Sequence, residues 1–437
     1  MEPSFPEGTA PDSRRKQLRE AKQLCARRFG EAKRAGLDTA ELKVEMQRIT
    51  QALAALDASE NNAAPAESAP QPTTPRLPRR FAAQAPGISE REAADAQIHR
   101  ATPADDAAWD GFVRAHPAAS LYQLSVWRRL IVNDMGHRDI SLVAKSPGGA
   151  VLGVLPLIEM RSRLFGNFAV SMPYFNYGGP LALHPLVEER LMARAAEVSA
   201  EHGLKHAEIR ETRPRSGWPA RDHKVLMIRA LPASEAELDA GLGSKLRAQV
   251  KRAEREQPAV QIGGAELLDA FYAAFARNMR DLGTPVYGKP FFRAVVAAWP
   301  ERSHVVAVTL RGRPVGGAIL LGFQDVLEIP WASTVRDVSA LGLNMLMYRA
   351  ILGFAIREGY GYFDFGRSTR DVGTYHFKRQ WGAEPVGCHW QYWLEGGRGL
   401  PELNPSNPRF RLFIAGWKRL PLWAANFLGY SLARALP

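Results

Sequence analysis

A duplicated order of predicted elements most constrains what this chain of 437 residues can fold into. The string VLGVLPL at 151–157 recurs as VGGAILL at 315–321. Each is preceded by another predicted strand and by a turn containing Gly or Pro, which predicts a β-hairpin in each half. Farther along, LMARA at 191–195 recurs as LMYRA at 346–350, and each begins a predicted helix that ends near a glycine and leads into a strand. Hairpin, helix and strand thus occur twice in one order, which predicts two copies of a single α/β unit rather than one large irregular domain.

The first 57 residues carry a helical pattern of a different kind. Apolar residues spaced alternately by four and three predict one helix seam, and a weaker seam precedes it. Gly36 can end the first helix, and Asp38 with Glu41 is a capping-box-like start for the second. We therefore predict an antiparallel helical hairpin whose first helix is strongly basic. The seam of the second helix consists of Leu42, Met46, Ile49, Leu53 and Leu56.

Composition divides the rest of the chain. The stretch from residue 58 to 97 is rich in Pro, Ala and Ser, which predicts a disordered linker because such a segment buries little apolar surface. The two α/β units are expected at 98–232 and 233–400, the second including a basic connector helix. The end of the chain, 401–437, mixes aromatic, Leu and basic residues in the pattern of an amphipathic helical tail.

The charge of the chain restricts its partners without naming one. Its formal net charge is +12 at pH 7, which predicts attraction to nucleic acid, a phosphorylated carrier or an acidic membrane surface. The two cysteines, Cys25 and Cys388, form no disulfide framework, and no metal-ligand spacing is present. Residues 1–10 lack the cationic and apolar regions of a signal peptide, and no run approaches the roughly twenty apolar residues of a membrane span. We expect a cytoplasmic protein, with peripheral contact at the inner membrane through the C-terminal tail.

The stretch FDFGRSTRDVGTYHFKRQWG at 363–382 holds the main candidate site. Loops beyond the carboxyl ends of strands are where α/β sheets bind ligands, and the polar residues of this loop suit an anionic group. Lys378, beside Phe377, can stabilise an oxyanion that develops during attack on a carbonyl. Asp364 is interpreted as the partner of a nearby arginine rather than as a general base. A solvated loop with a lysine on an edge strand remains the alternative. The proposed anion-binding residues are Arg367, Ser368 and Arg370.

Three further segments contribute candidates for substrate binding. Tyr287 and Lys289 flank a Gly/Pro turn in RNMRDLGTPVYGKPFF, which fits a substrate-gripping loop or a basic surface loop. Arg336 lies in STVRDVSALGLN, just before a predicted helix, where coenzyme A could bind although no Gly-x-Gly is present. Tyr177 precedes Gly178 and Gly179 in FNYGGPLA, and these glycines permit positive φ or close backbone approach, or form a plain turn.

Several of these strings together resemble the FemAB-like acyltransferases. They are LGSKLRAQVKRAERE, RDLGTPVYGKPFF, ALGLNMLMYRAI and YFDFGRSTRDVGTYHFKRQWGAE, and the similarity runs from about Ile98 to the C-terminus. More narrowly, the chain resembles the branch associated with the exosortase/PEP-CTERM system. The resemblance implies an α/β (α+β) fold of two tandem N-acetyltransferase-like domains with mixed central sheets. It also implies an aromatic–lysine pair at the reaction centre, which falls on Phe377 and Lys378.

The resemblance implies an activity and a donor as well. Members of the family transfer an acyl or aminoacyl group to an amine, so we expect amide formation on a cell-envelope or exopolysaccharide-related precursor. No resident cofactor is expected, and the donor is aminoacyl-tRNA or, as an alternative, acyl-CoA. A rival interpretation is a non-catalytic binding or docking protein of the exopolysaccharide or exosortase system, since one fold hosts either.

The N-terminal hairpin resembles a second family. The string RRFGEAKRAGLDTAELKVEMQRI is similar to the tRNA-contacting coiled-coil arm of seryl-tRNA synthetases. A basic helical hairpin can follow an RNA backbone through phosphate contacts, which makes tRNA a candidate partner. A coiled coil that binds another protein or a second copy of the chain is the other interpretation.

Overall fold

The computed structural model describes residues 77–82, 87–162, 166–214, 217–401 and 408–436, together with seventeen positions between 17 and 52. The chain forms two units, Met1–Thr73 and Thr74–Pro437. In the first unit the described positions in 17–32 and 41–52 are helical. The thiol of Cys25 lies 3.4 Å from the carbonyl oxygen of Leu42, so the two helices are in contact. Residues 53–76, which include the first part of the predicted linker, lie outside the described residues.

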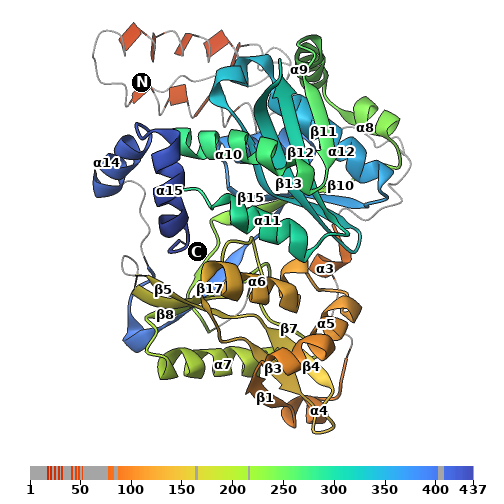
Figure 1. The fold of residues 1–437 in the computed structure, drawn as a ribbon, viewed down its shortest axis with the longest axis vertical. Helices are drawn as coiled ribbons and strands as arrows, with labels where there is room; N and C mark the ends of the chain where they lie inside the picture. Colours follow the sequence, from red (N-terminus) through yellow and green to blue (C-terminus); the bar gives the residue numbers. More distant parts are fainter. Residues whose placement is uncertain are drawn as a thin grey trace, which may run out of the picture. The chain divides into compact units, whose positions relative to one another are not determined.

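The second unit contains two lobes (Figure 1). We call the ten strands β1–β9 and β17, with their helices, the first lobe; β10–β16 and their helices form the second lobe. A four-stranded sheet of the first lobe has the order β1 (Gln97–Arg100), β3 (Leu142–Lys145), β4 (Val151–Leu155) and β7 (Leu181–Ala182). Its six-stranded sheet has the order β2 (Arg138–Asp139), β5 (Ile158–Ser162), β6 (Gly166–Val170), β8 (His206–Glu211), β17 (His389–Leu394) and β9 (Ala220–Arg221).

The second lobe is built on one seven-stranded sheet. Its order is β11 (Ala259–Gly263), β12 (Ser303–Leu310), β13 (Arg313–Phe323), β14 (Val326–Thr334), β15 (Tyr362–Thr369), β10 (Lys224–Ala230) and β16 (Glu384–Gly387). Neighbouring strands pair antiparallel except β14 and β15, which are parallel. The first lobe has one parallel pair too, β6 with β8. The mixed α/β fold predicted from the sequence is confirmed.

The predicted repeat is present in the structure. Each lobe contains an antiparallel hairpin, β3–β4 or β12–β13, followed later by a long helix and a strand that pairs in parallel. The helix is α7 (Pro185–Glu201) in the first lobe and α12 (Leu343–Arg357) in the second, and the strands that follow are β8 and β15. Apolar residues of α7 face the first-lobe sheet and those of α12 face the second-lobe sheet, which gives two separate helix-side cores.

The two lobes exchange strands, which corrects the predicted domain boundaries. β10 lies within the predicted first domain, 98–232, yet it pairs with β15 and β16 of the second lobe. β17 lies within the predicted second domain, 233–400, yet it pairs with β8 along six registered positions. Both strands are apolar enough to be buried in either sheet, so the local pattern does not state which sheet receives them.

The remaining helices cover the sheets and join the lobes. The first lobe has α4 (Glu90–Ala94), α5 (Asp106–Ala115) and α6 (Ser125–Met135). The second has α8 (Glu235–Gly241), α9 (Ser244–Arg255), α10 (Leu268–Leu282), α11 (Lys289–Ala298) and α13 (Gly373–Gln380). One apolar cluster runs through both lobes, because Phe175 of the first contacts Trp331 of the second at a ring distance of 5.8 Å. Burial of such aromatic side chains, about 2–3 kcal/mol each, fixes the lobes against one another.

Two helices follow at the C-terminus, α14 (Pro408–Trp417) and α15 (Leu422–Ala433). Small residues of α15 are buried, and a side chain on Gly429 would lie 3.0 Å from the backbone nitrogen of Val286 in the second lobe. Arg434 donates to the carbonyl oxygen of Met135 in the first lobe at 2.8 Å. The helix therefore contacts both lobes.

The predicted linker is wrong for its last part. Residues 77–82 include the short helix α3 (Arg79–Ala82), and residues 90–100 form α4 and β1. Leu77 and Phe81 pack against the apolar cluster shared by the lobes, and Ala93 and Ala96 are buried in the first lobe. The Pro-rich average of the whole stretch hides these short apolar groups.

Candidate active site at the junction of the lobes

Two carboxylates lie where the central strands of the second lobe separate. β14 and β15 pair at three positions only, and Glu328 with Asp364 is the last of them. Both side chains are buried, with 3% and 0% of the residue exposed. A parallel pair that separates in mid-sheet leaves space between its strands, and here that space begins with two acidic groups.

A loop of the first lobe supplies partners for these carboxylates. Asn176 donates from Nδ2 to Oε1 of Glu328 at 2.6 Å. The Tyr177 hydroxyl lies 3.1 Å from Oε2 of Glu328 and 3.2 Å from Oδ2 of Asp364. Burial, together with the charge of Asp364, raises the pKa of Glu328 above its usual value. Glu328 therefore favours its neutral, protonated form beside the negative charge of Asp364.

A positive charge that faces these carboxylates comes from the segment before the first lobe. Nη2 of Arg80, on α3, donates to Oδ2 of Asp364 at 2.8 Å, across 284 positions of sequence. The Arg80 side chain is only 7% exposed, and its guanidinium lies 5.1 Å from the ring centre of Tyr177. The interpretation of Asp364 as the partner of an arginine is confirmed.

Lys378 lies on α13, the helix that follows β15. Its ammonium donates to the carbonyl oxygens of Gly366 at 3.1 Å and Arg367 at 2.8 Å, and the residue is 8% exposed. Gly366 has a φ of 71°, which distorts β15 where the two carbonyls meet the lysine. Burial lowers the pKa of Lys378 to about 8. An ammonium has three N–H groups, so one remains for an oxygen of a ligand.

Two arginines at corresponding places of the repeat meet on one indole. Arg210 follows Glu208 on β8, as Arg367 follows Asp364 on β15. Each guanidinium lies 4.7 Å from the ring centre of Trp390 on the exchanged strand β17. Burial lowers the pKa of Arg367 to about 10, and the charge of Arg210 acts in the same direction. Glu208 accepts a hydrogen bond from Nε of Arg210 at 2.7 Å and compensates its charge, so Arg367 supplies the positive charge next to the acidic pair.

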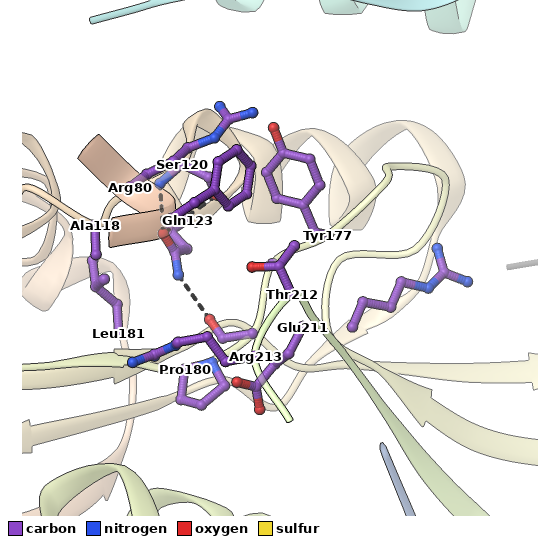
Figure 2. A pocket seen from close by; sticks show the side chains of 14 residues that line it. Arg80, Ala118, Ser120, Gln123, Tyr177, Pro180, Leu181, Glu211, Thr212 and Arg213 are labelled. Atoms are coloured by element: carbon purple, nitrogen blue, oxygen red, sulfur yellow. Dashed lines mark hydrogen bonds between the residues drawn. The ribbon is translucent and has the colours of Figure 1, made fainter. Parts of the chain in front are cut away.

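A small cavity of about 50 Å³ adjoins this centre in the first lobe. Figure 2 shows Arg80 and Tyr177 on one side of it, and Pro180, Glu211 and Arg213 on the other. Gln123 closes one wall, since its Nε2 donates to the carbonyl oxygen of Gly179 at 2.8 Å. The predicted close approach at the two glycines is present, because a side chain on Gly179 would lie 2.3 Å from Cγ of Glu211.

Several predicted site residues come together here. Tyr177, Arg367 and Lys378 take part in the buried cluster described above. Tyr287 lies close enough for the charges of Arg367 and Arg210 to oppose the rise that burial causes in its pKa. Ser368 is buried, and its hydroxyl has no hydrogen-bond partner in the described part of the chain. Phe377 packs on the core of the second lobe, with its ring 5.1 Å from that of Tyr348.

Other predicted residues lie outside the cluster. Arg370 and Arg336 are exposed. The ammonium of Lys289 pairs with Asp269 at 3.0 Å, between the first turns of α11 and α10. None of these three therefore belongs to the buried centre.

Sequence reasoning missed four members of the centre: Arg80, Asn176, Arg210 and Glu328. Glu328 could have been recognised from the sequence, because it lies in the apolar run VLEIPWA. A charged residue inside a buried strand is seldom found unless it is paired or functional. Arg80 had a weaker signal, the basic–aromatic group PRRFA inside a stretch that otherwise predicts disorder. Within the described ranges, no group of three or more His, Cys, Asp or Glu residues is arranged to hold a metal ion.

Comparison with known proteins gives one family match. Residues 243–379, from α9 to α13, match the model of the acetyltransferase (GNAT) domain. The match contains β14, β15 and Lys378, so the buried centre lies partly inside it. No curated protein matches the chain.

Comparison with solved structures gives matches that cover 67% to 70% of this chain. A crystal structure of FemX has a TM-score of 0.51 at 14% identity, and the alignment covers 67% of this chain and 96% of that one. The C-terminal domain of a putative lysylphosphatidylglycerol synthetase from Agrobacterium fabrum has a TM-score of 0.46 at 12% identity, covering 68% and 93%. A tandem GNAT protein from the clavulanic acid biosynthesis pathway has a TM-score of 0.42 at 12% identity, covering 70% and 100%. The chain has the fold of FemX, with a GNAT-like acetyltransferase domain in its second lobe.

Proposed function

We propose that this protein is an acyl- or aminoacyltransferase that forms an amide on an amine of a cell-envelope or exopolysaccharide-related precursor. The observation that carries the proposal is the environment of Lys378. This ammonium is buried, is held by two main-chain carbonyls, and lies in an acetyltransferase-like domain beside a pair of buried carboxylates. The class of acceptor rests on the resemblance to the FemAB-like family and its exosortase/PEP-CTERM branch.

The chemistry assigned to the site is one acyl transfer. The nitrogen of the acceptor amine attacks the carbonyl carbon of the donor, and the carbonyl oxygen becomes an oxyanion that receives the free N–H of Lys378. The C–O bond of an ester donor, or the C–S bond of a thioester donor, then breaks. The amine loses one proton and the leaving group gains one, and the ionised fraction of Glu328, a buried group whose pKa is raised, can relay it.

Label transfer tests this proposal. The full chain is incubated with a cell extract and either radiolabelled aminoacyl-tRNA or radiolabelled acetyl-CoA, and labelled small molecules are separated and identified by mass spectrometry. Lys378→Met is expected to lose at least about a hundredfold in rate, since it removes an oxyanion donor. Lys205→Met, exposed just before β8, is the matched control and is expected to keep the rate of the unaltered protein. Equal product from Lys378→Met and Lys205→Met contradicts the proposal.

The surroundings of α12 favour aminoacyl-tRNA over acyl-CoA as the donor. The loop before α12, at 335–343, packs together with apolar residues of α9, and the carbonyl of Gln249 lies 3.3 Å from the position of a side chain on Gly342. α9 therefore covers the helix start where a pyrophosphate would bind. The outer face of α9 is basic and suits a nucleic-acid backbone. Its exposed basic residues are Lys245, Arg247, Lys251, Arg252 and Arg255, with the acidic Glu254 among them.

Filter binding of charged tRNA tests this donor. The full chain is compared with a variant in which Arg15, Arg19 and Lys22 of the N-terminal hairpin are changed to Glu, and with Arg252→Glu on α9. Loss of retention in the hairpin variant, with a reduced salt dependence, supports tRNA as the partner of the hairpin. Negligible retention of the unaltered protein removes tRNA from the proposal and leaves acyl-CoA as the donor.

The C-terminal helices suggest where the protein works. Trp423 and Phe427 of α15 are 75% and 78% exposed, and Phe413 of α14 is 43% exposed. Lys418 and Arg419, both exposed, lie in the turn between the helices. Exposed aromatic residues beside basic ones are the pattern of a surface that lies on acidic lipid. We propose a peripheral position at the inner membrane; no helix in the described ranges has the length and apolarity to cross one.

A further inference from the structure

As far as the structure describes it, the segment 77–82 is held to the two lobes by side chains alone, as a bound peptide would be. In the described residues, the only backbone hydrogen bond of this segment outside its own helix runs from the amide of Phe81 to the carbonyl of Pro78, within the segment itself. No strand or main-chain bond joins it to either lobe there. It is held instead by Leu77 and Phe81 against the apolar cluster, and by Arg80 on Asp364.

The site that receives Arg80 is built for one cation. Its carboxylates are already supplied with hydrogen bonds from neutral donors. Asn176 donates to Oε1 of Glu328, and the Tyr177 hydroxyl donates to Oε2 of the same residue. The amide of Gly366 donates to Oδ1 of Asp364 at 2.8 Å. These donors are all neutral and leave a net negative charge. Lys378 lies close enough for its charge to interact with both carboxylates, but its described hydrogen bonds go to main-chain carbonyls. Among the described residues, Arg80 is therefore the cation that hydrogen-bonds a carboxylate of this pair, and a buried carboxylate strongly favours such a partner.

Arg80 satisfies the site incompletely. Its Nη2 bonds Asp364, but its Nε is buried without a hydrogen-bond partner among the described residues. Arginine–carboxylate pairs are frequently bidentate, with two parallel N–H···O bonds, and this pair has one. The single bond and the unpartnered Nε instead suit an occupant that is exchanged.

The cavity provides a route for another occupant. Arg80 and Phe81 form part of its lining, together with Tyr177, Gly178 and Gly179. Arg80 therefore stands between this cavity and the carboxylates. Withdrawal of the segment 77–82 would join the two spaces into one and expose the acidic pair to a ligand.

We propose that Glu328, Asp364 and Tyr177 form a binding site for an alkylguanidinium or alkylammonium group, and that Arg80 occupies this site as a tethered ligand in the free protein. The further step, that this cationic group is the acceptor amine of the reaction, rests on the proposed function. The binding itself does not, since it needs neither donor nor turnover. Displacement of Arg80 then couples entry of the ligand to opening of the site.

The test uses the full chain and agmatine, an alkylguanidinium, with N-butylurea as the neutral control. Arg80→Ala is expected to melt at a lower temperature than the unaltered protein and to be restabilised by agmatine in a saturable way, with no response to butylurea. The unaltered protein binds agmatine about tenfold more weakly or worse by calorimetry, because its site is occupied for most of the time. Asp364→Asn in the Arg80→Ala background abolishes the response. Arg194→Ala, which removes a half-buried arginine of α7 that pairs with Glu201, is expected to respond to agmatine as the unaltered protein does.

A second measurement on the unaltered protein covers the case in which Arg80→Ala fails to fold. Saturating agmatine, but not butylurea, is expected to accelerate cleavage after Phe81 by chymotrypsin, because the displaced segment leaves the apolar cluster. Arg80→Gln, which keeps a polar side chain but removes the charge and shortens it, is expected to be cleaved rapidly without agmatine. An agmatine response of Arg80→Ala or Arg80→Gln no larger than that of the unaltered protein, with unchanged cleavage, makes Arg80 a structural tie and overturns the proposal. Loss of acyl transfer in Lys378→Met leaves this result untouched, so the two proposals fail separately.

Discussion

The hydroxyl of Tyr177 lies 3.1 Å from Oε2 of Glu328, and these residues belong to different lobes. Both residues are buried, so water cannot replace the hydrogen bond if the hydroxyl is removed. Tyr177→Phe removes the hydroxyl and keeps the ring, which leaves both carboxylates with one donor fewer. We expect a loss of about 1–3 kcal/mol in the free energy of unfolding, measured by urea denaturation. Tyr375→Phe is the control, because the Tyr375 hydroxyl makes no hydrogen bond in the described part of the structure. Equal stability of the two variants contradicts the assignment.

The buried ammonium of Lys378 predicts a pH dependence of stability. Its pKa is about 8 in the folded protein and 10.5 ordinarily, so between these values the unfolded chain binds more protons. Stability contributed by this group therefore rises with pH from about 8 to 10.5, by up to about 3 kcal/mol. Urea denaturation of the unaltered protein and of Lys378→Met, at pH 7 and pH 10.5, isolates the effect, because other titrating groups cancel in the difference. A difference that is the same at both pH values contradicts the burial of this amine.

The same titration predicts an opposite trend in activity. Only the ammonium form of Lys378 can donate to an oxyanion, and Asp364, Arg367 and Glu328 are the charged groups that act on it. Acyl transfer is therefore expected to fall as the pH rises through about 8, in the range where the folded protein gains stability from this group. The rate measured from pH 6.5 to 9.5 tests this, with denaturation at each pH to show that the protein stays folded. A flat profile removes Lys378 from the reaction.

The sequence reveals the repeated unit but not how its two copies are connected. Hairpin, helix and strand follow from local periodicity, and the structure contains them in both lobes. The placement of β10 and β17 depends on contacts between residues far apart in the chain, which no local pattern encodes. The residues of the buried centre also fall into two groups, those that the sequence predicts and those that it does not. Lys378 and Arg367 follow a strand end where ligands are expected, whereas Arg80 reaches Asp364 across 284 positions from a segment whose composition suggests disorder.

The exchange of β10 and β17 predicts that the lobes do not fold separately. A fragment 87–232 lacks β17, so β8 becomes an exposed edge strand, and a fragment 233–437 lacks β10 from the middle of its sheet. We expect each fragment to aggregate or to give no cooperative unfolding transition, and the two expressed together to form a complex. The unit 74–437 is the control and is expected to unfold cooperatively. Circular dichroism and size-exclusion chromatography measure this, and independent cooperative folding of either fragment contradicts the prediction.

The exposed aromatic residues of α15 predict binding to acidic lipid. Trp423→Ala with Phe427→Ala removes two side chains that are mostly in contact with water, so the free energy of unfolding is expected to change by less than about 0.5 kcal/mol. Burial of both rings in an interface is worth about 3 kcal/mol, and their removal is expected to weaken binding to phosphatidylglycerol vesicles about a hundredfold in co-sedimentation. Val372→Ala, another exposed apolar position, is the matched control. Vesicles of phosphatidylcholine alone are expected to bind weakly, because Lys418 and Arg419 then lack an anionic partner. If the double variant and Val372→Ala partition equally, α15 is not the surface that contacts the membrane.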